Sequence, residues 1–392
     1  MEGRALRVLM YSPQFHPLQG GYERAAARVS AELAARGYRV EVVTERRERA
    51  WPAADRVNGV AVRRLPVVFR PGLHAASAGA ALAAWLLPSL RRFDVLHAHT
   101  FGSQTAVAIA AARLLRVPVV LKLPSMGEGG VAMLAGRGPV RAGVRALHRG
   151  VDACLAPSRA VRDEAVAFGI PGERVHLLPN GIDTAAFRPA STEGRAEARR
   201  KLGIEGDGPL VLCIARLSPE KGLFTLLGAW ERIAVAHPDA RLAVVGDGPD
   251  RAALEAAVAA SPASATVRIA GPTTDTRPWY AAADVLVVPS DFEGFSNVLL
   301  EGMSAGLPVA ATRVSGTVDV FAEAEVGEMA EPRDPAALAA ALERMLDDGG
   351  RRAACGAAAR SLAERKYSLA RVVDELETIY AGVVRPAASR ES

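Results

Sequence analysis

Short runs of apolar residues alternate along this chain with longer stretches in which apolar residues recur every three or four positions. The short runs are typical of strands buried within a parallel sheet, and the longer stretches are typical of amphipathic helices that cover such a sheet. Because strands that alternate with helices connect through right-handed crossovers, the pattern predicts an α/β protein built on parallel sheets.

The pattern contains two series of elements. In the first series the predicted strands are 6–11, 38–44, 60–65, 94–98, 118–123, 152–156 and 175–178, and the predicted helices are 23–36, 72–90 and 103–115. In the second series the predicted strands are 210–215, 241–245, 266–270, 284–288 and 308–311, and the predicted helices are 222–236, 250–260, one opening at 297, and 369–383. The strands that open with Asp94-Val95-Leu96 and Asp284-Val285-Leu286 are similar, which suggests that the two series are related halves.

The length and the termini limit the class of protein. A chain of 392 residues that is 50% hydrophobic is long enough for two or three domains with sizeable cores. The predicted helix 72–90 is as long as a membrane span, but it contains His74 and Pro88 and is rich in alanine, which favours a helix packed on the sheet. Residues 1–10 lack the apolar core of a signal peptide.

Charge and cysteine content narrow the function. The net charge of +5 and the pI near 9.4 permit anionic substrates or an anionic membrane face. No basic run with interleaved aromatic residues is present, so a nucleic-acid partner is not favoured. Cys154, Cys213 and Cys355 are widely spaced and form no CxxC pair. They fit a reducing cytoplasm better than a disulfide framework or a zinc site.

The most informative segment is 293–301, which follows the apolar run 283–289. Its turn is expected at the carboxyl end of a buried strand, where open α/β sheets bind ligands. A helix that opens at Asn297 would direct free backbone N–H groups at a phosphate. Glu293 and Glu301 bracket the turn and could accept hydrogen bonds from sugar and ribose hydroxyls.

Other charged positions also follow predicted strands. Arg216 and Lys221 lie on a loop, where they could neutralise a diphosphate, although surface charge is the simpler alternative. Gly20 and Gly21 follow the first strand and would let the backbone approach a phosphate closely. Glu23 could cap the next helix or reach an acceptor.

These motifs occur in the order found in the family 4 retaining glycosyltransferases, and the chain resembles that family over 6–380. The matching segments are 13–23, 93–99, 179–183 with Phe187, 215–222, 245–249, 293–301 and 305–309. The resemblance implies a GT-B fold, in which two Rossmann-like β/α/β domains face each other across a central cleft. It also implies an acceptor-binding domain 1–187, a donor-binding domain 188–368 with its boundary near 187–194, and a helix 369–392 that crosses back to the first domain.

The resemblance also implies roles for individual residues. The residues expected to take part in catalysis are Arg216, Lys221, Glu293 and His99. The residues expected to contact the nucleotide-sugar donor are Gly20, Gly21, Gly248, Gly294, Phe295, Ser296, Asn297, Val298, Leu299 and Glu301. The residues expected to contact the acceptor are Glu23, Lys122 and Ser125. His97 and His99 end a strand expected to face the cleft, where a structural role is the alternative.

One position departs from the family pattern. Family members often carry a histidine after the strand that ends near Leu123, and that histidine contacts the donor sugar near C6. Here the position is Pro124. Lys122, Ser125 or the glycine-rich stretch that follows could take over, which leaves the identity of the sugar open. Lys122 could contact phosphate, or it could be a core lysine that extends its amine to solvent.

The function expected from the resemblance is transfer of a hexosyl group from a UDP- or GDP-sugar to an acceptor hydroxyl, with retention at the anomeric carbon. No D-x-D metal motif is evident, so neither a metal nor another cofactor is expected. The alternatives are a GT-B sugar-nucleotide epimerase and a non-catalytic sugar-nucleotide-binding protein. A dinucleotide-binding oxidoreductase is disfavoured, because the segment after the first strand lacks G-x-G-x-x-G.

The acceptor is the least determined part. A cell-envelope polysaccharide or glycolipid is one expectation. The enzyme would then be cytoplasmic and would contact the inner face of the membrane through a strip of arginines on one helix face, namely Arg137, Arg141, Arg145 and Arg149. A solvated helix face explains the same spacing. A natural product such as an aminocyclitol is the other expectation.

Overall fold

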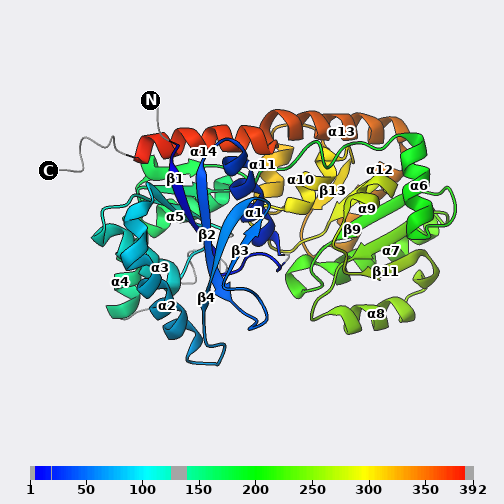
Figure 1. Cartoon of the computed structure of the whole chain (residues 1–392). Helices are drawn as coiled ribbons and strands as arrows, with labels where there is room; N and C mark the ends of the chain where they lie inside the picture. The colour runs from blue at the N-terminus through cyan, green and yellow to red at the C-terminus, as the bar shows by residue number, and fades with distance from the viewer. Residues whose placement is uncertain (1–4, 19, 125–138, 385–392) are drawn as a thin grey trace. The chain divides into compact units, whose positions relative to one another are not determined.

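The structure is a computed structural model of the chain that describes residues 5–18, 20–124 and 139–384 (Figure 1). By its internal contacts the chain divides into two compact units. Unit 1 comprises Met1–Gly181 and Leu369–Ser392, and unit 2 comprises Ile182–Ser368. Phe187, at the end of the expected first domain, stacks edge-on against Tyr280 within unit 2, with ring centroids 5.6 Å apart. The chain therefore leaves unit 1 before the expected linker.

Unit 1 is built on an eight-stranded sheet in the order β3-β4-β2-β1-β5-β6-β7-β8. Its strands are β1 (Arg7–Tyr11), β2 (Arg39–Arg46), β3 (Ala54–Val57), β4 (Val60–Pro66), β5 (Val95–Ala98), β6 (Val119–Lys122), β7 (Ala153–Ala156) and β8 (Val175–Leu177). Its helices are α1 (Gly21–Ala35), α2 (His74–Ser89), α3 (Ser103–Leu114), α4 (Pro139–Arg149), α5 (Arg159–Phe168) and α14 (Leu369–Val383), with short 3₁₀ turns at Leu90–Arg92 and Gly172–Arg174.

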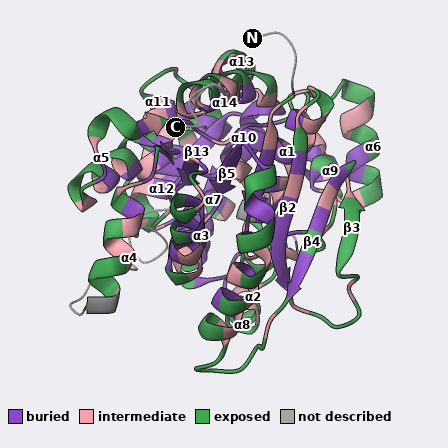
Figure 2. Cartoon of the chain, turned by 60° about the vertical axis from the view of Figure 1, so that its left-hand side comes forward, coloured by how far each residue is buried: buried purple, intermediate pink, exposed green. Residues whose placement is uncertain are grey.

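Strand β3 is the exception to the parallel pattern. It pairs with β4 in antiparallel fashion, and it is largely exposed at the edge of the sheet, as its green colour in Figure 2 shows. The connecting residues Asn58 and Gly59 both have positive φ angles, 49° and 80°. A two-residue turn of this kind requires left-handed backbone at both positions, which Asn-Gly accommodates best. This hairpin was not predicted from the sequence, although Asn-Gly is its usual signal.

The C-terminal helix α14 completes the core of unit 1. Val372, Val373, Leu376 and Tyr380 are buried together with Val8, Met10 and Leu33. Arg36, which follows α1, forms ion pairs with Asp374 (2.6 Å) and Glu377 (3.2 Å). The helix is therefore an integral layer of unit 1.

Unit 2 is built on a six-stranded parallel sheet in the order β11-β10-β9-β12-β13-β14. Its strands are β9 (Leu210–Ile214), β10 (Arg241–Val245), β11 (Val267–Gly271), β12 (Val285–Val288), β13 (Val309–Thr312) and β14 (Gly327–Ala330). Its helices are α6 (Thr192–Leu202), α7 (Leu223–Ala236), α8 (Arg251–Ala260), α9 (Arg277–Ala282), α10 (Asn297–Ser304), α11 (Ser315–Phe321), α12 (Pro335–Asp347) and α13 (Gly349–Leu362). Shorter helical segments lie at Pro219–Lys221, Ser264–Thr266 and Ala363–Tyr367.

The structure supports the inference of two related halves. In both sheets the first strand of the unit lies at the centre, and the strand order reverses beside it: β4-β2-β1-β5-β6 in unit 1 and β11-β10-β9-β12-β13 in unit 2. Asp94, before β5, accepts a hydrogen bond from the backbone N–H of Arg7 at 2.8 Å. Asp284, before β12, accepts one from the backbone N–H of Leu210, also at 2.8 Å. The carboxylate thus joins the two central strands in each unit.

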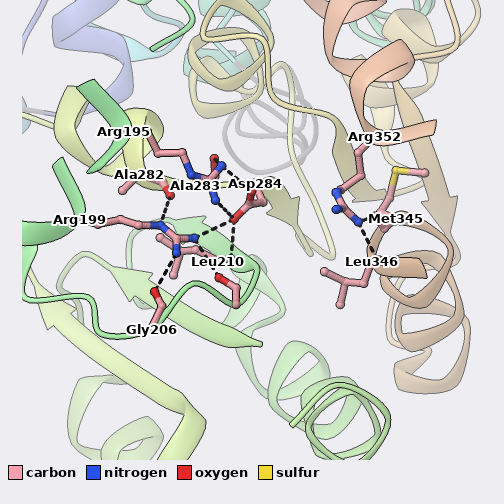
Figure 3. Close-up of polar contacts among 11 residues, drawn as sticks. Arg195, Arg199, Gly206, Leu210, Ala282, Ala283, Asp284, Met345, Leu346 and Arg352 are labelled. Atoms are coloured by element: carbon pink, nitrogen blue, oxygen red, sulfur yellow. Dashed lines mark hydrogen bonds and ion pairs between the residues drawn. The ribbon is translucent and has the colours of Figure 1, made fainter. Parts of the chain in front are cut away.

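In unit 2 this carboxylate belongs to a larger network (Figure 3). Asp284 also accepts hydrogen bonds from Arg195 (2.6 Å) and Arg199 (2.9 Å), both on α6. Arg199 is buried and donates to the carbonyls of Gly206 and Ala282 as well. The network fixes α6, β9 and the start of β12 to one another. In the same view Arg352 donates to the last carbonyls of α12, at Met345 and Leu346.

The structure confirms the α/β class and the parallel sheets, apart from β3. The described residues contain no helix that is both long and apolar enough to cross a membrane, and the segment predicted at 72–90 forms α2, with Leu82 and Leu86 buried. Strand β14 and the helices α5, α6, α9, α11, α12 and α13 were not anticipated. Strand β14 has the sequence Gly-Glu-Met-Ala, which contains no apolar run that would indicate a buried strand.

The Asp284 network leads to a prediction about stability. Replacing Asp284 by alanine leaves Arg199 buried without its carboxylate, and breaking such a pair costs about 3 kcal/mol of the free energy of unfolding. Urea unfolding followed by circular dichroism measures this loss. The matched control is Asp275→Ala, which removes an exposed pair with Arg277 and is expected to cost below about 1 kcal/mol. Equal losses in the two variants would contradict a central role for Asp284.

Candidate functional site

Three loops of unit 2 meet at one edge of its sheet. They follow β9, β10 and β12, which are adjacent parallel strands. The backbone N–H of Leu217, after β9, donates to the carbonyl of Asp247, after β10, at 3.0 Å. The N–H of Asp291, after β12, donates to the carbonyl of Glu220 at 2.9 Å. Because the strand order reverses between β9 and β12, this edge is the topological switch point at which such sheets bind ligands.

Two of the predicted catalytic residues pair at this edge. Nζ of Lys221 lies 3.1 Å from Oε2 of Glu293, and both side chains are about one-fifth exposed, at 21% and 18%. The hydroxyl of Ser290 donates to the same oxygen of Glu293 at 3.0 Å. Thr312, fully buried at the end of β13, donates to the backbone carbonyl of Ser290. The carboxylate and the ammonium are therefore held by three neighbouring strands rather than by flexible surface contacts.

Arg216 lies on the same loop as Lys221, and its side chain is exposed. Its charge also affects Glu220. Burial opposes the shift, but the hydrogen bond from Ser218 and the positive charges of Lys221 and Arg216 lower the pKa of the Glu220 carboxyl. Both cations thus contribute positive potential to the loop after β9.

Glycines allow the three loops to approach so closely. Gly222 has a φ of 63°, and a Cβ there would overlap the backbone carbonyl of Pro289. A Cβ on Gly246 would overlap the carbonyl of Ala215, and one on Gly248 would overlap the carbonyl of Leu217. The predicted donor residue Gly248 therefore has a packing role, whatever ligand it contacts.

The segment after Glu293 turns into α10. Ser296 is the N-cap of this helix, and its hydroxyl accepts a hydrogen bond from the N–H of Leu299 at 3.3 Å. Asn297 and Val298 open the helix and are half-buried, whereas Leu299 is fully buried. The side chain of Leu299 is therefore not accessible to a ligand, and the positive end of the helix dipole lies at this turn.

Gly294 and Phe295 are held in place by packing against Tyr367 and Gly316. The Phe295 side chain is buried, and its ring lies 5.7 Å from that of Tyr367. A Cβ on Gly316, at the start of α11, would press against the backbone of both Gly294 and Phe295. These two predicted donor residues can offer backbone groups to a ligand, while the phenyl ring anchors the turn.

Glu301 lies deeper than the sequence suggested. Its side chain is buried, and its Oε2 accepts a hydrogen bond from the hydroxyl of Tyr280 at 3.0 Å. Tyr280 belongs to α9, which no motif had indicated. The burial excludes a role for Glu301 as an ordinary surface glutamate in the first turns of the helix.

The corresponding edge of unit 1 holds the other predicted residues. Gly20 is the N-cap of α1, and Gly21 is its first residue. The carboxylate of Glu23 folds back over Gly20, so that a Cβ on Gly20 would collide with it, and Gln14 donates to Glu23 Oε1 at 2.8 Å. Glu23 is buried in this position. That arrangement is typical of a residue that supports the helix start.

His97 lies in β5 and His99 follows that strand, and their rings stack with centroids 4.2 Å apart. His97 Nδ1 lies 2.6 Å from the hydroxyl of Tyr380 on α14. Burial, and then the charges of His99 and Lys122, hold the pKa of His97 well below its usual value. Burial and the charge of Lys122 lower the pKa of His99 to about 3. Both rings are therefore neutral at pH 7.

The remaining predicted residues are in part outside the described chain. Ser125 and Arg137 lie in 125–138, outside the described residues. Pro124, which replaces the family histidine, is half-buried. On α4, Arg149 donates to the backbone carbonyl of Phe168 at 2.7 Å and lies over the Phe168 ring. The last arginine of the predicted strip therefore contacts the protein itself.

The sequence analysis gave no role to several residues that shape these sites. They are Gly222, Tyr280, Ser290, Thr312 and Gly316. Gly222 stood in a motif, where a glycine after Pro-Glu-Lys is a usual signal for a turn that ends in left-handed backbone. Ser290 contacts the nearby Glu293, whereas Tyr280, Thr312 and Gly316 act through contacts with more distant residues, for which a single sequence holds no local signal.

The two sheets with their sites at the switch points define a glycosyltransferase of the GT-B type. The family model "Glycosyl transferases group 1" matches residues 194–362, and the model "Glycosyltransferase Family 4" matches residues 19–186. The chain belongs to glycosyltransferase family 4. It is therefore a transferase, as the sequence motifs predicted.

Named relatives agree with this assignment. A D-inositol 3-phosphate glycosyltransferase of Acidothermus cellulolyticus is 32% identical over 379 residues, which cover 88% of this chain and 83% of that protein. A GDP-mannose-dependent alpha-mannosyltransferase of Mycolicibacterium smegmatis is 31% identical over 389 residues, which cover 97% and 98%.

Solved structures share the fold. Alr3699/HepE of Anabaena, crystallised with UDP and glucose, superposes with a TM-score of 0.78 at 20% identity and covers 96% of this chain and 99% of that chain. The lipopolysaccharide glycosyltransferase WaaG superposes with a TM-score of 0.73 at 22% identity, over 95% and 99%. At these identities the likeness establishes the GT-B fold alone.

The contact at Gly222 leads to a prediction about the site. Gly222→Ala adds a Cβ where the carbonyl of Pro289 lies, so the loops after β9 and β12 must separate. We expect a loss of stability well above the about 1–2 kcal/mol that a left-handed φ alone costs, together with weaker nucleotide binding. Calorimetry measures both. Gly206→Ala is the matched control, because its φ is also positive (80°) but no atom lies within 4 Å of the added Cβ. If both variants bind nucleotide equally, the close approach does not shape the site.

The buried histidines lead to a prediction about pH. The pKa of His99 is lowered to about 3 and that of His148 to about 4, chiefly by burial, while an unfolded histidine titrates near 6.5. Between these values the unfolded chain binds more protons, so the stability of unit 1 is full above pH 6.5 and is lost as the pH falls towards 4. Urea midpoints between pH 7.5 and 4.5 measure this slope. His99→Gln should reduce it, and His16→Gln, which replaces an exposed histidine, is the control variant.

Proposed function

We propose that the chain transfers a hexosyl group from a nucleotide-diphosphate sugar to an acceptor hydroxyl, with retention of configuration and formation of an α-glycosidic bond. The observation that carries the proposal is the Lys221–Glu293 pair at the switch point of unit 2, beside the start of α10. The relative named as a GDP-mannose-dependent alpha-mannosyltransferase supports this class of donor. UDP- and GDP-sugars are both candidate donors.

In the proposed reaction the bond between the anomeric carbon and the diphosphate oxygen breaks, and the acceptor oxygen bonds to that carbon on the same face. The proton of the acceptor hydroxyl passes to the departing diphosphate. Lys221, Arg216 and the amino end of α10 stabilise the charge that develops there. Glu293 accepts hydrogen bonds from the sugar hydroxyls, and the Tyr280 hydrogen bond orients Glu301 for the ribose hydroxyls.

We propose that the donor binds without a metal ion, because Lys221 and Arg216 supply the positive charge that a metal would otherwise bring.

The acceptor is proposed to be a glycolipid, a polysaccharide precursor or a polar natural product. A cytoplasmic location is proposed from the three cysteines, which are all buried and unpaired. On α4, Arg149 contacts both the carbonyl and the ring of Phe168. This contact favours packing of Arg149 against the protein over contact of Arg149 with a membrane.

The donor site is tested by thermal stabilisation with UDP, GDP, ADP and dTDP, with and without EDTA. A ligand that binds only the folded chain raises the melting temperature by mass action. We expect one nucleotide to stabilise the protein selectively and EDTA to have no effect. A failure of all four nucleotides at millimolar concentration would contradict the donor site, and a loss of stabilisation in EDTA would contradict metal-free binding.

The role of the cation is tested by Lys221→Met. Removing one preorganised donor to a developing oxyanion lowers kcat by roughly 10²–10³-fold. Turnover is measured as nucleotide release from the donor selected above. The matched control is Lys201→Met, at an exposed lysine paired with Glu197 on the helix surface. Loss of activity in both variants would point to a general effect of charge rather than to the site.

A further inference from the structure

Arg333 has a backbone conformation that its place in the fold does not require. Among the residues that the structure describes, those other than glycine with a positive φ are Asn58 (49°), Arg116 (57°) and Arg333 (60°). Asn58 forms the β3–β4 turn, and Arg116 follows the end of α3, where left-handed backbone commonly terminates a helix. Arg333 terminates no helix, because it lies between β14 and Asp334, the N-cap of α12. A side chain in this conformation costs free energy that glycine would not cost, so we expect the arginine side chain to act elsewhere.

The side chain of Arg333 reaches the loop that follows β12. Its Nε donates to Oδ2 of Asp291 at 2.8 Å. The loops after β12 and β14 lie at the same edge of the parallel sheet, with β13 between them. The guanidinium is 79% exposed, whereas the carboxylate is only 13% exposed. Because exposed ion pairs add little to stability, the contact matters chiefly for the mostly buried carboxylate.

Asp291 brings a negative charge to the loop that is proposed to bind the diphosphate. Its Oδ1 is buried and has no hydrogen-bond partner among the described residues. The same oxygen lies 3.3 Å from the position of a Cβ on Gly222, the residue after Lys221. The backbone N–H of Asp291 donates to the carbonyl of Glu220 at 2.9 Å. The carboxylate is therefore packed where the loops after β9 and β12 touch, and an unbalanced charge there would repel a diphosphate.

The other carboxylates of these two loops find their partners within the loops. Glu293 pairs with Lys221 at 3.1 Å. Glu220 accepts a hydrogen bond from the hydroxyl of Ser218 at 2.6 Å. Asp291 differs, because the cation that balances it comes from the separate loop between β14 and α12.

We propose that Arg333 is a positioning residue of the donor site. Its guanidinium neutralises Asp291, so the carboxylate stays packed against Gly222 and the loop after β12 keeps the conformation that presents Glu293. Without the guanidinium the carboxylate would turn towards solvent, because a buried charge without a partner is costly. The inference rests on the proposed function, and it adds to the donor site a loop that no sequence motif indicated.

Glycine separates the effect of the side chain from that of the backbone. Arg333→Gly removes the guanidinium and accepts the left-handed φ without strain, so the melting temperature should stay near that of the wild type. The affinity for UDP or GDP, whichever stabilises the wild type, should nevertheless fall about 10-fold, because a negative charge beside the diphosphate is no longer balanced. Isothermal titration calorimetry measures this loss. The matching nucleoside monophosphate carries less charge and should lose less affinity.

Arg116→Gly is the matched control, because it makes the same substitution at a similar φ in unit 1. It should leave the nucleotide affinity unchanged. If Arg333→Gly lowers the melting temperature and leaves the affinity as it was, the ion pair only stabilises the fold and the proposal is wrong.

A second substitution tests how Arg333 acts. In the double variant Arg333→Gly/Asp291→Asn no unbalanced carboxylate remains, and an uncharged amide has less reason to leave its packed position. The affinity for the nucleoside diphosphate should therefore largely return. An affinity that stays low in the double variant would mean that the guanidinium contacts the nucleotide itself, which would overturn the positioning role.

Amide hydrogen exchange without ligand keeps this inference separate from the donor site. The N–H of Asp291 is bonded to Glu220, so it should exchange faster in Arg333→Gly than in the wild type or in Arg116→Gly. If it does so while UDP, GDP, ADP and dTDP all fail to bind, the donor site is wrong and the effect of Arg333 on the loop stands. If a nucleotide binds and Arg333→Gly changes neither the exchange nor the affinity, the donor site stands and the role of Arg333 is wrong.

Discussion

One hydrogen bond recurs at the centre of both units, from the first residue of the central strand to the aspartate that precedes its neighbour. Arg7 donates to Asp94, and Leu210 donates to Asp284, each at 2.8 Å. The bond fixes the two strands between which the strand order reverses, at the end of the sheet opposite the ligand edge. Because strands are stiff over four or five residues, fixing one end sets where the loops at the other end emerge.

In unit 2 the fixed strands bring the loops after β9 and β12 close together, and the candidate site lies where these loops meet. The pair of Lys221 and Glu293 depends on Gly222, which lets the loop after β9 touch the backbone of Pro289. Thr312 and Ser290 then hold Glu293 from the side of β13. Positive charge, helix dipole and carboxylate are thus arranged before any substrate arrives, which is the condition for electrostatic catalysis. Unit 1 repeats the frame but places imidazoles and an amine at the equivalent edge.

The sequence predicted the frame of this structure better than the details. Buried parallel strands such as Val285–Val288 carry a strong apolar signal, and the last helix, predicted at about 369–383, is found at Leu369–Val383. Motifs also brought Lys221 and Glu293 to the same edge. Contacts between distant segments could not be predicted, such as the hydrogen bond of Tyr280 to Glu301, because neither residue has a local pattern that indicates its partner. The hairpin at Asn58-Gly59 was missed for a different reason, since its strand Ala54–Val57 is polar and exposed.

The path of the chain has a consequence for its synthesis. Unit 2 is inserted into unit 1, because α14 supplies Val372, Leu376 and Tyr380 to the core that began with β1. When the chain leaves the ribosome, unit 2 has all of its strands and helices while unit 1 still lacks a layer. Domains usually fold in the order of synthesis, from the N-terminus. Here unit 2 can complete its fold before α14 has been made, whereas unit 1 can complete its fold only after α14 has left the ribosome. Until then the apolar surface beneath α14 is open to chaperones.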